Sequence, residues 1–153
     1  AITAELMHRG VSPKHMYSEI YEKRSSPQLR LLGRALSTLK MEELGDIAYM
    51  DLTRQMFAEE GVKSVLTDEF INYPRSVKGV KVAVFFKESV ENPEAVNVSF
   101  RSTVDINVDE IASRFGGGGH HKAAGCLLKG RLEDVRRQVL EEVKKSLKGK
   151  AGR

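Results

Sequence analysis

Two adjacent stretches of the sequence constrain the fold more than any other feature. Residues 79–89 read GVKVAVFFKES and residues 94–102 read EAVNVSFRS, with VENP between them. In the first stretch, hydrophobic residues fill consecutive positions instead of every second one, which is typical of a strand buried on both faces. We therefore predict an α/β fold in which a central mixed sheet is flanked by helices.

The neighbouring sequence predicts further strands and helices with recognisable ends. Thr53 and Asn107 are N-cap residues, and Glu110 lies at the capping-box position after Asn107. Gly61 suits a left-handed helix end, and Pro74 is expected to stop a helix. The elements that we predict are strands at residues 46–52 and 123–130 and helices at residues 54–61, 64–74, 108–115 and 132–147, followed by a frayed tail.

The first 42 residues are predicted to be helical throughout. Ser12 and Pro13 mark one helix start, and a third helix opens near Ser26. The hydrophobic faces expected for the three helices are Ile2, Leu6 and Met7; Met16, Ile20 and Tyr21; and Leu29, Leu32, Leu36 and Leu39. These faces are too few for a separate core, so we predict linker helices at 1–42 and the α/β domain at 43–153. The chain begins without methionine, which suggests a piece of a longer protein.

Composition and charge exclude several classes of protein. The longest apolar run, residues 82–86, is far shorter than the roughly 20 residues that a membrane span needs, and no leader pattern opens the chain. A single cysteine, Cys126, excludes an internal disulfide and suits a reducing compartment. We therefore expect a cytoplasmic protein with no membrane partner. The net charge is +4, and residues 131–153 carry eight Lys/Arg against four Asp/Glu, which is weak support for a polyanionic partner.

A run of four glycines, Gly116, Gly117, Gly118 and Gly119, precedes His120 and His121 in the stretch FGGGGHHKAAG. One interpretation is a flexible connection between a helix and a strand. The other is a loop whose backbone approaches a ligand closely, with free amides for anionic oxygens and histidines as donors. The spacing matches neither a dinucleotide-binding motif nor a P-loop. Adjacent histidines seldom reach one ion, and no cluster of Asp, His or Cys is evident, so we expect no metal site in this chain.

Arg101 and Ser102 end the second central strand, thirteen residues or so before the glycines. Strand ends beside glycine-rich loops are common ligand sites in α/β sheets. Arginine offers a fork of donors for phosphate, and serine offers a short hydroxyl donor. The alternative is that Arg101 pairs with Asp105 or Asp109.

Taken together, VSFRSTVDINVDEIASRFGGGGHHKAAGC resembles the C-terminal substrate-binding (DHH-associated) domain of DHH family phosphoesterases. The branch it is most similar to is the bacterial bifunctional oligoribonucleases that also dephosphorylate 3′-phosphoadenosine 5′-phosphate (pAp). The motif positions matched are residues 117–120 and 123–125. The resemblance implies that Arg101, Ser102 and residues 117–120 hold a phosphate and a nucleoside. Gly116 and His121 are extra to the motif, and Asn72 and Arg75 are weaker candidates at the rim.

The same resemblance implies what this chain lacks. In the family an N-terminal DHH domain holds two Mn²⁺ ions, and no Asp-His-His signature occurs here. The expected partners are therefore that domain and short RNA, dinucleotides or pAp, and the chain alone is expected to be inactive. Residues 1–42 would include the end of the missing catalytic domain. The alternatives are a self-sufficient module that binds single-stranded nucleic acid, or a structural or dimerisation domain; the preferred substrate and a homodimer stay open.

Overall fold

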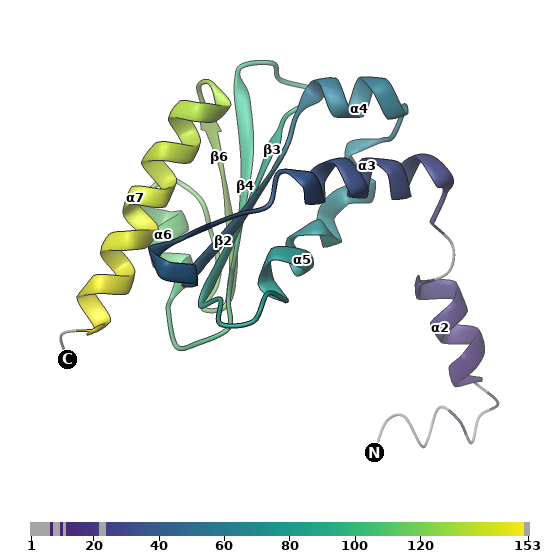
Figure 1. Cartoon of the computed structure of the whole chain (residues 1–153), viewed down its shortest axis with the longest axis horizontal. Coiled ribbons are helices and arrows are strands. Elements are labelled where there is room, and N and C mark those ends of the chain that lie inside the picture. The colour runs from purple at the N-terminus through teal and green to yellow at the C-terminus, as the bar shows by residue number, and fades with distance from the viewer. Residues whose placement is uncertain (1–6, 8–9, 11, 22–23, 152–153) are drawn as a thin grey trace.

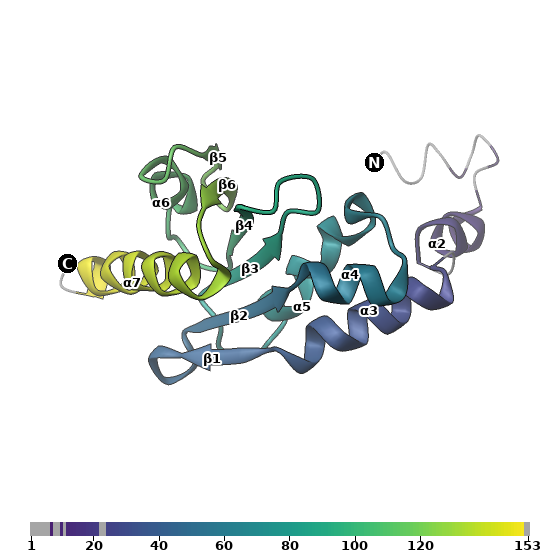
Figure 2. The same cartoon turned by 90° about the horizontal axis from the view of Figure 1, so that it is seen from above.

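A computed structural model describes residues 7, 10, 12–21 and 24–151, and the structure below concerns only these. Its centre is one mixed sheet with the strand order β1-β2-β3-β4-β6-β5, in which β2 and β3 are parallel and the other neighbours antiparallel. Helices lie on both sides of it (Figures 1 and 2). The strands are β1 Lys40–Glu42, β2 Ile47–Leu52, β3 Val82–Glu88, β4 Ala95–Ser102, β5 Gly118–His120 and β6 Ala123–Lys129. The helices are α2 Pro13–Tyr21, α3 Ser26–Ser37, η1 Glu43–Gly45, α4 Arg54–Glu60, η2 Ser64–Ile71, α5 Asn72–Arg75, α6 Val108–Ser113 and α7 Leu132–Ala151.

The predicted α/β fold is confirmed, and the two stretches that predicted it are the central strands β3 and β4. The first five residues of β3 are all buried, as expected for a strand covered on both faces. Consecutive side chains of a strand point to opposite faces, so β3 contributes to two separate hydrophobic cores. One core holds Val82, Val84 and Phe86, and the other holds Ala83 and Phe85.

The two faces of the sheet are covered to different extents. Helices α6 and α7 cover one face, and the core beneath them includes residues of β2, β3, β4 and β6. Helices α3, α4 and α5, with η2, cover the other face, where the sheet contributes core residues from β2 and β3 only. On that second face, β4 and β6 present the half-buried Asn97, Ser99, Arg101 and Gly125 and the exposed Leu127. We call this uncovered half the open face.

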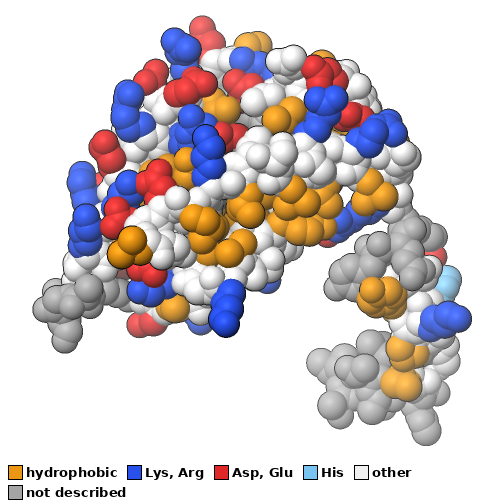
Figure 3. Space-filling view, viewed as in Figure 1, with side chains coloured by type: hydrophobic (Ala, Val, Ile, Leu, Met, Phe, Trp, Pro, Cys, Tyr) orange, Lys and Arg blue, Asp and Glu red, His pale blue; other side chains and the backbone are white. Residues whose placement is uncertain are grey.

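Helix α3 forms as predicted but buries a different side. Ser25 caps it in a capping box with Gln28. Its buried residues are Leu31, Leu32 and Ala35, which pack over the sheet, whereas Leu29 and Leu36 are exposed. The expected face was wrong in these two positions because the helix has leucines on more than one side, so periodicity alone cannot select one. Figure 3 shows hydrophobic side chains gathered over α3 and β1 on the side that it displays.

The segment before β3 also differs from its prediction. Residues 64–71 form the 3₁₀ helix η2 and continue into the short helix α5, with Pro74 inside α5 instead of beyond its end. Proline is tolerated there because amides in the first turn of a helix need no intrahelical acceptor. Strand β1 and the turn η1 were not predicted.

The C-terminal elements agree with the prediction except at their ends. Asn107 caps α6, but its side chain accepts from the Asp109 amide and donates to the Glu110 carboxylate, so the capping box is only partly formed. Helix α6 ends at Ser113, two residues early, and α7 runs to Ala151 with no frayed tail before that residue.

The N-terminal segment bears on how the chain is organised. Of the helix predicted around residues 2–7, only Met7 lies within the described residues, where its side chain is exposed. Helix α3 shares a core with β2, and β1 pairs with β2, so the structure joins residues 26–42 closely to the sheet. The boundary after residue 42 stays a prediction. Within the described ranges, no helix has both the length and the hydropathy that a membrane span requires.

Candidate functional site

A groove of about 500 Å³ lies on the open face of the sheet. Its floor comes from β4, where Asn97, Ser99 and Arg101 alternate along the strand and therefore share one face. The remaining lining residues come from η2, β3, β4 and β6: Asp68, Phe85, Lys87, Val98, Gly125 and Cys126. The groove is thus a polar depression on a rigid sheet and not a gap between loops.

Sheet register brings Arg101 and His120 into one row. Arg101 is paired with Ala123 of β6, and Ala123 is paired with His120 of β5. Cross-strand partners project from the same face, so only a methyl group stands between the two longer side chains. In the next row Ser99 is paired with Gly125, and Gly125 with Gly118, so two positions in that row have no side chain. The row therefore forms a low floor beside Arg101.

The electrostatics of this end of the groove favour an anion. The Arg101 side chain is half-buried, and its Nη1 donates to the Phe100 carbonyl at 2.9 Å. Burial lowers the pKa of Arg101 below its usual range, and the nearby Arg75 guanidinium lowers it further. Arginine keeps its charge under such conditions. An anion bound at Arg101 would also be attracted by the positive charge of Arg75, which belongs to α5.

The sheet itself accounts for most of the glycine run. A Cβ on Gly117 would lie 2.2 Å from the Gly125 carbonyl oxygen, and a Cβ on Gly119 would lie 2.6 Å from the Ala124 Cα. Gly116 also has a φ of +73°, which other residues rarely adopt. Glycine is required at positions 117 and 119 because the backbone there lies so close to β6, and at position 116 because of its φ. Gly118 differs, since a Cβ there would meet only the Asp109 Oδ1 atom at 3.5 Å.

The amides of the run already have acceptors within the protein. Those of Gly116 and Gly117 donate to the carbonyls at the end of α6, and the Gly119 amide donates to Asp109 Oδ1 at 2.7 Å. The run is therefore an ordered turn and edge strand, not a flexible connection. An anion could bind to the Gly119 amide only by displacing the Asp109 carboxylate, which already accepts its hydrogen bond. The geometry favours side chains over loop amides as contacts for an anion.

The other predicted site residues lie elsewhere. Ser102 is buried on the opposite face from Arg101, and its hydroxyl donates to the Val104 carbonyl at 2.6 Å. His121 lies in the turn between β5 and β6, where its Nε2 is 3.0 Å from Asp105 Oδ1. Asn72 is exposed on α5, outside the lining of the groove. The structure thus places Arg101 and His120 in one row, and of the predicted site residues only Arg101 lines the groove itself. Asp105 and Asp109 have other partners than Arg101, which was the predicted alternative.

Four polar or charged groove residues were missed by the sequence prediction. Asn97 and Ser99 could have been found, because polar residues at every second position up to Arg101 mark one exposed face of a strand. Lys87 is the penultimate residue of β3 and faces the same groove. Asp68 had no comparable signal, since only the packing of η2 beside β3 brings it to the groove.

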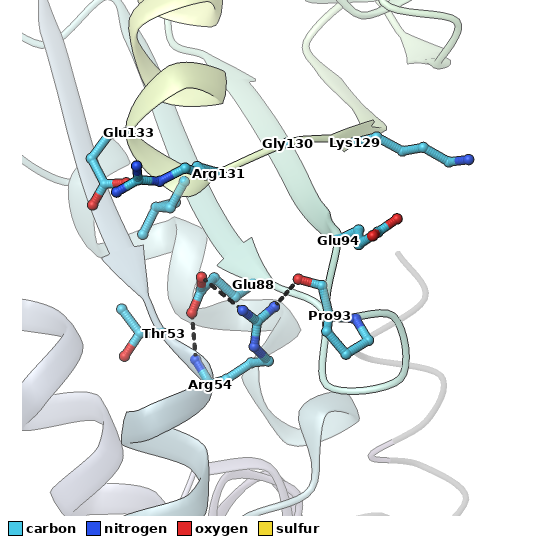
Figure 4. Close-up of a pocket in the computed structure, with 10 residues that line it drawn as sticks. Thr53, Arg54, Glu88, Pro93, Glu94, Lys129, Gly130, Arg131 and Glu133 are labelled. Carbon is cyan, nitrogen blue, oxygen red and sulfur yellow. Dashed lines mark hydrogen bonds and ion pairs between the residues drawn. The ribbon is translucent and has the colours of Figure 1, made fainter.

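A second and larger hollow, of about 690 Å³, lies at the other end of the sheet (Figure 4). Its charges are matched: the Arg54 amide donates to Glu88 Oε2 at 2.8 Å, and the Arg54 guanidinium contacts Glu88 and donates to the Pro93 carbonyl. The charged side chains around it are three basic and three acidic, namely Arg54, Lys129, Arg131, Glu88, Glu94 and Glu133. Because its cations are largely balanced, this hollow is less suited to an anion than the smaller groove.

Metal ligands do not converge anywhere in the described part of the chain, where no three His, Cys, Asp or Glu side chains form a group that could hold an ion.

Sequence comparison identifies the family. Residues 46–149 match the DHHA1 domain, so the chain belongs to the DHHA1 domain family, and the resemblance drawn from the glycine motif is confirmed. The chain is 34% identical over 147 residues to the bifunctional oligoribonuclease and PAP phosphatase NrnA of Thermus thermophilus, which covers 95% of this chain and 43% of that protein. The chain thus spans less than half the length of this curated relative.

Solved structures support the same fold. An exopolyphosphatase-related protein of Bacteroides fragilis superimposes with a TM-score of 0.82 at 27% identity, covering 97% of this chain and 42% of that one. A pGpG-specific phosphodiesterase, PggH of Vibrio cholerae, has a TM-score of 0.53 at 14% identity over 89% of this chain and 43% of that one, which shows the fold alone.

Proposed function

We propose that this chain is the substrate-binding part of a phosphoesterase that hydrolyses short oligoribonucleotides, dinucleotides and pAp. The observation that carries the proposal is the row that holds Arg101 and His120 on the open face. The positive charge of Arg75, which lowers the pKa of Arg101, adds to the attraction for an anion there. The printed activities of the Thermus thermophilus relative, oligoribonuclease and PAP phosphatase, support this substrate class.

In this proposal the groove holds one end of the substrate. The Arg101 guanidinium binds a terminal phosphate with two donors, and His120 donates to the same phosphate or to the adjoining ribose. Ser99, one row along the floor, offers a hydroxyl within reach of a ribose. Fixing one end of a short substrate orients its scissile phosphate, and positioning of this kind can supply several kcal/mol of rate enhancement.

The chemistry itself belongs to an N-terminal DHH domain in this proposal. Two Mn²⁺ ions bound there would activate a water molecule and stabilise charge on the transferring phosphoryl group. On the open face no helix of the described residues adds a hydrophobic core over β4 and β6, and such a domain would need this surface to reach the bound substrate. Hydrolysis is accordingly expected from the full-length protein and not from this chain alone.

The test is Arg101→Ala in the full-length protein with a dinucleotide substrate. We expect KM to rise by roughly a hundredfold, because a half-buried charged donor is lost while its phosphate partner stays desolvated. Arg137→Ala is the matched control, since Arg137 is exposed on α7 and pairs with Asp134 away from the groove. An unchanged kcat/KM in the Arg101 variant would contradict the proposal.

A self-sufficient module for single-stranded nucleic acid is the main alternative. Such modules stack bases on exposed aromatic rings. Here Phe85, Phe86, Phe100 and Tyr49 are all buried in the two cores. Salt dependence separates the two functions: a groove for one or two phosphates gives a shallow decline of affinity with salt, and tracking along a strand gives a steep one.

A further inference from the structure

The end of the groove far from Arg101 has a different chemistry. Lys87 Nζ lies 2.9 Å from Asp68 Oδ1, and the Lys87 side chain is 14% exposed while that of Asp68 is 71% exposed. Asn97 is the cross-strand partner of Lys87 and lines the same groove. The Lys87 ammonium is thus largely buried against the sheet and pairs with an exposed carboxylate, and the Asn97 side-chain amide lies on the strand beside Lys87.

This end and the Arg101 end belong to one continuous depression. Asn97 and Arg101 are four residues apart on β4, which corresponds to about 13 Å at the rise of an extended strand. Between them lie Ser99 and the bare position of Gly125. A single nucleotide bridges a gap of this kind when its phosphate lies at Arg101, its ribose near Ser99, and its base at the far end.

The far end is unsuited to a second phosphate, because Asp68 would repel it and already neutralises Lys87. A carboxylate acceptor beside an ammonium donor is instead complementary to the edge of a nucleobase, the feature that proteins read on unpaired bases. We propose that Asp68, Lys87 and Asn97 form a base-recognition subsite that prefers guanine. This inference rests on the proposed function, because it requires a nucleotide phosphate at Arg101.

Guanine is preferred because of how its hydrogen-bonding groups are ordered. Its N1–H and 2-amino group are two adjacent donors, which one carboxylate can accept together, and its O6 beside them is an acceptor for a lysine ammonium. Adenine, cytosine and uracil each present at most one donor position on that edge. The exposure of Asp68 to water weakens the contact, so the preference expected is about tenfold, the low end for a bidentate base contact.

The experiment is calorimetric titration of the full-length protein, without divalent metal, with the four ribonucleoside 5′-monophosphates. We expect guanosine monophosphate to bind about tenfold more tightly than the other three. Asp68→Asn removes the charged acceptor and should lower guanosine monophosphate affinity to that of the others while leaving adenosine monophosphate unchanged. Glu91→Gln, at an exposed carboxylate between β3 and β4, is the control and should change none of the four.

The outcomes distinguish this subsite from the proposed function. Equal affinities for the four nucleotides, or an equal loss of all four in Asp68→Asn, would overturn the guanine subsite and leave phosphate binding in place. Arg101→Ala should weaken all four nucleotides by the same factor. If none of the four binds to the unsubstituted protein, both the subsite and the proposed function are overturned.

Discussion

The two faces of the sheet use the same strands for different purposes. Strand β4 gives Val98 and Phe100 to the core beneath α6 and α7, and gives Ser99 and Arg101 to the open face. The first set has almost no contact with water, whereas the second set lines a groove. Adjacent residues of β4 therefore serve different purposes. Substitutions on the core side should lower stability, and substitutions on the groove side should lower binding affinity.

The largest effect is expected for Phe100→Ala compared with Ser99→Ala. Phe100 is fully buried, so its truncation should lower the free energy of unfolding by about 3–5 kcal/mol. Ser99 faces the groove, and its variant should stay within about 0.5 kcal/mol of the original protein. Urea denaturation measures both. If both variants lost a similar free energy of unfolding, the two faces of β4 would not differ in their contribution to stability.

The face of the sheet beneath α6 and α7 is not wholly hydrophobic, because it contains a buried ion pair. Asp51 of β2 pairs with Arg136 of α7. Burial raises the pKa of Asp51 above its usual range, although Arg136 acts to lower it. A raised pKa in the fold means that the protonated form is favoured there, so stability linked to this group is greatest at acid pH and is lost as the pH rises through the folded pKa.

Arg136→Met should therefore destabilise most at neutral pH, where the Asp51 carboxylate loses its partner while still buried. We expect a loss of roughly 2–4 kcal/mol at pH 7, which narrows as the pH falls toward the ordinary aspartate range. Denaturation at several pH values tests this. Arg137→Met, whose partner Asp134 is exposed, is the control and should show a small loss that is independent of pH. A loss in Arg136→Met that stays constant with pH would argue against an uncompensated carboxylate.

The glycine run forms the turn after α6 and most of the edge strand β5. One pair of variants tests whether close packing against β6 requires glycine there. Gly119→Ala would place a Cβ 2.5 Å from the Ala123 carbonyl oxygen, at a φ of +157°. We expect a loss of about 2 kcal/mol or more, because β5 must move away from β6. Gly118→Ala has room for a methyl group and should change stability by less than about 0.5 kcal/mol. Thermal unfolding of the two variants measures the difference, and equal melting temperatures would refute the close contact.

A smaller loss than for Phe100, Arg136 or Gly119 is expected for Ser102→Ala. Its buried hydroxyl donates to Val104 on the covered side of β4, so its loss should cost about 1 kcal/mol of stability. Nucleotide affinity should not change, in contrast to Arg101→Ala at the adjacent position. Weaker nucleotide binding in the Ser102 variant would show that this serine contributes to the groove, as the sequence prediction had it.

Local pattern was enough to predict the central strands and the helix caps. Strands β3, β4 and β6 were predicted because their hydrophobic residues are dense, and α4 because Thr53 and Gly61 mark its two ends. Strand β5 was missed because glycine has little strand propensity. Its pairing depends instead on the small residues Ala124 and Gly125, which let the two backbones approach.

The candidate site was predictable only in part, for a related reason. Arg101 and His120 stand out by residue type, and sheet register then places them in one row. Ser102 was grouped with Arg101 because the two are adjacent in sequence, yet adjacent residues of a strand point in opposite directions. Asp68 could not be predicted at all, since its position depends on tertiary packing of a 3₁₀ helix.

The bond between Asp109 and the Gly119 amide has a consequence for solubility. Strand β5 is an edge of the sheet, and an outward-pointing amide on an edge strand can recruit a strand from another molecule. Asp109 occupies that amide and adds a negative charge beside it. At the other edge, β1 is three residues long and carries Lys40 and Glu42. Both margins of the sheet are thereby protected against association between molecules, so a polar face can stay open without inviting aggregation along its sides.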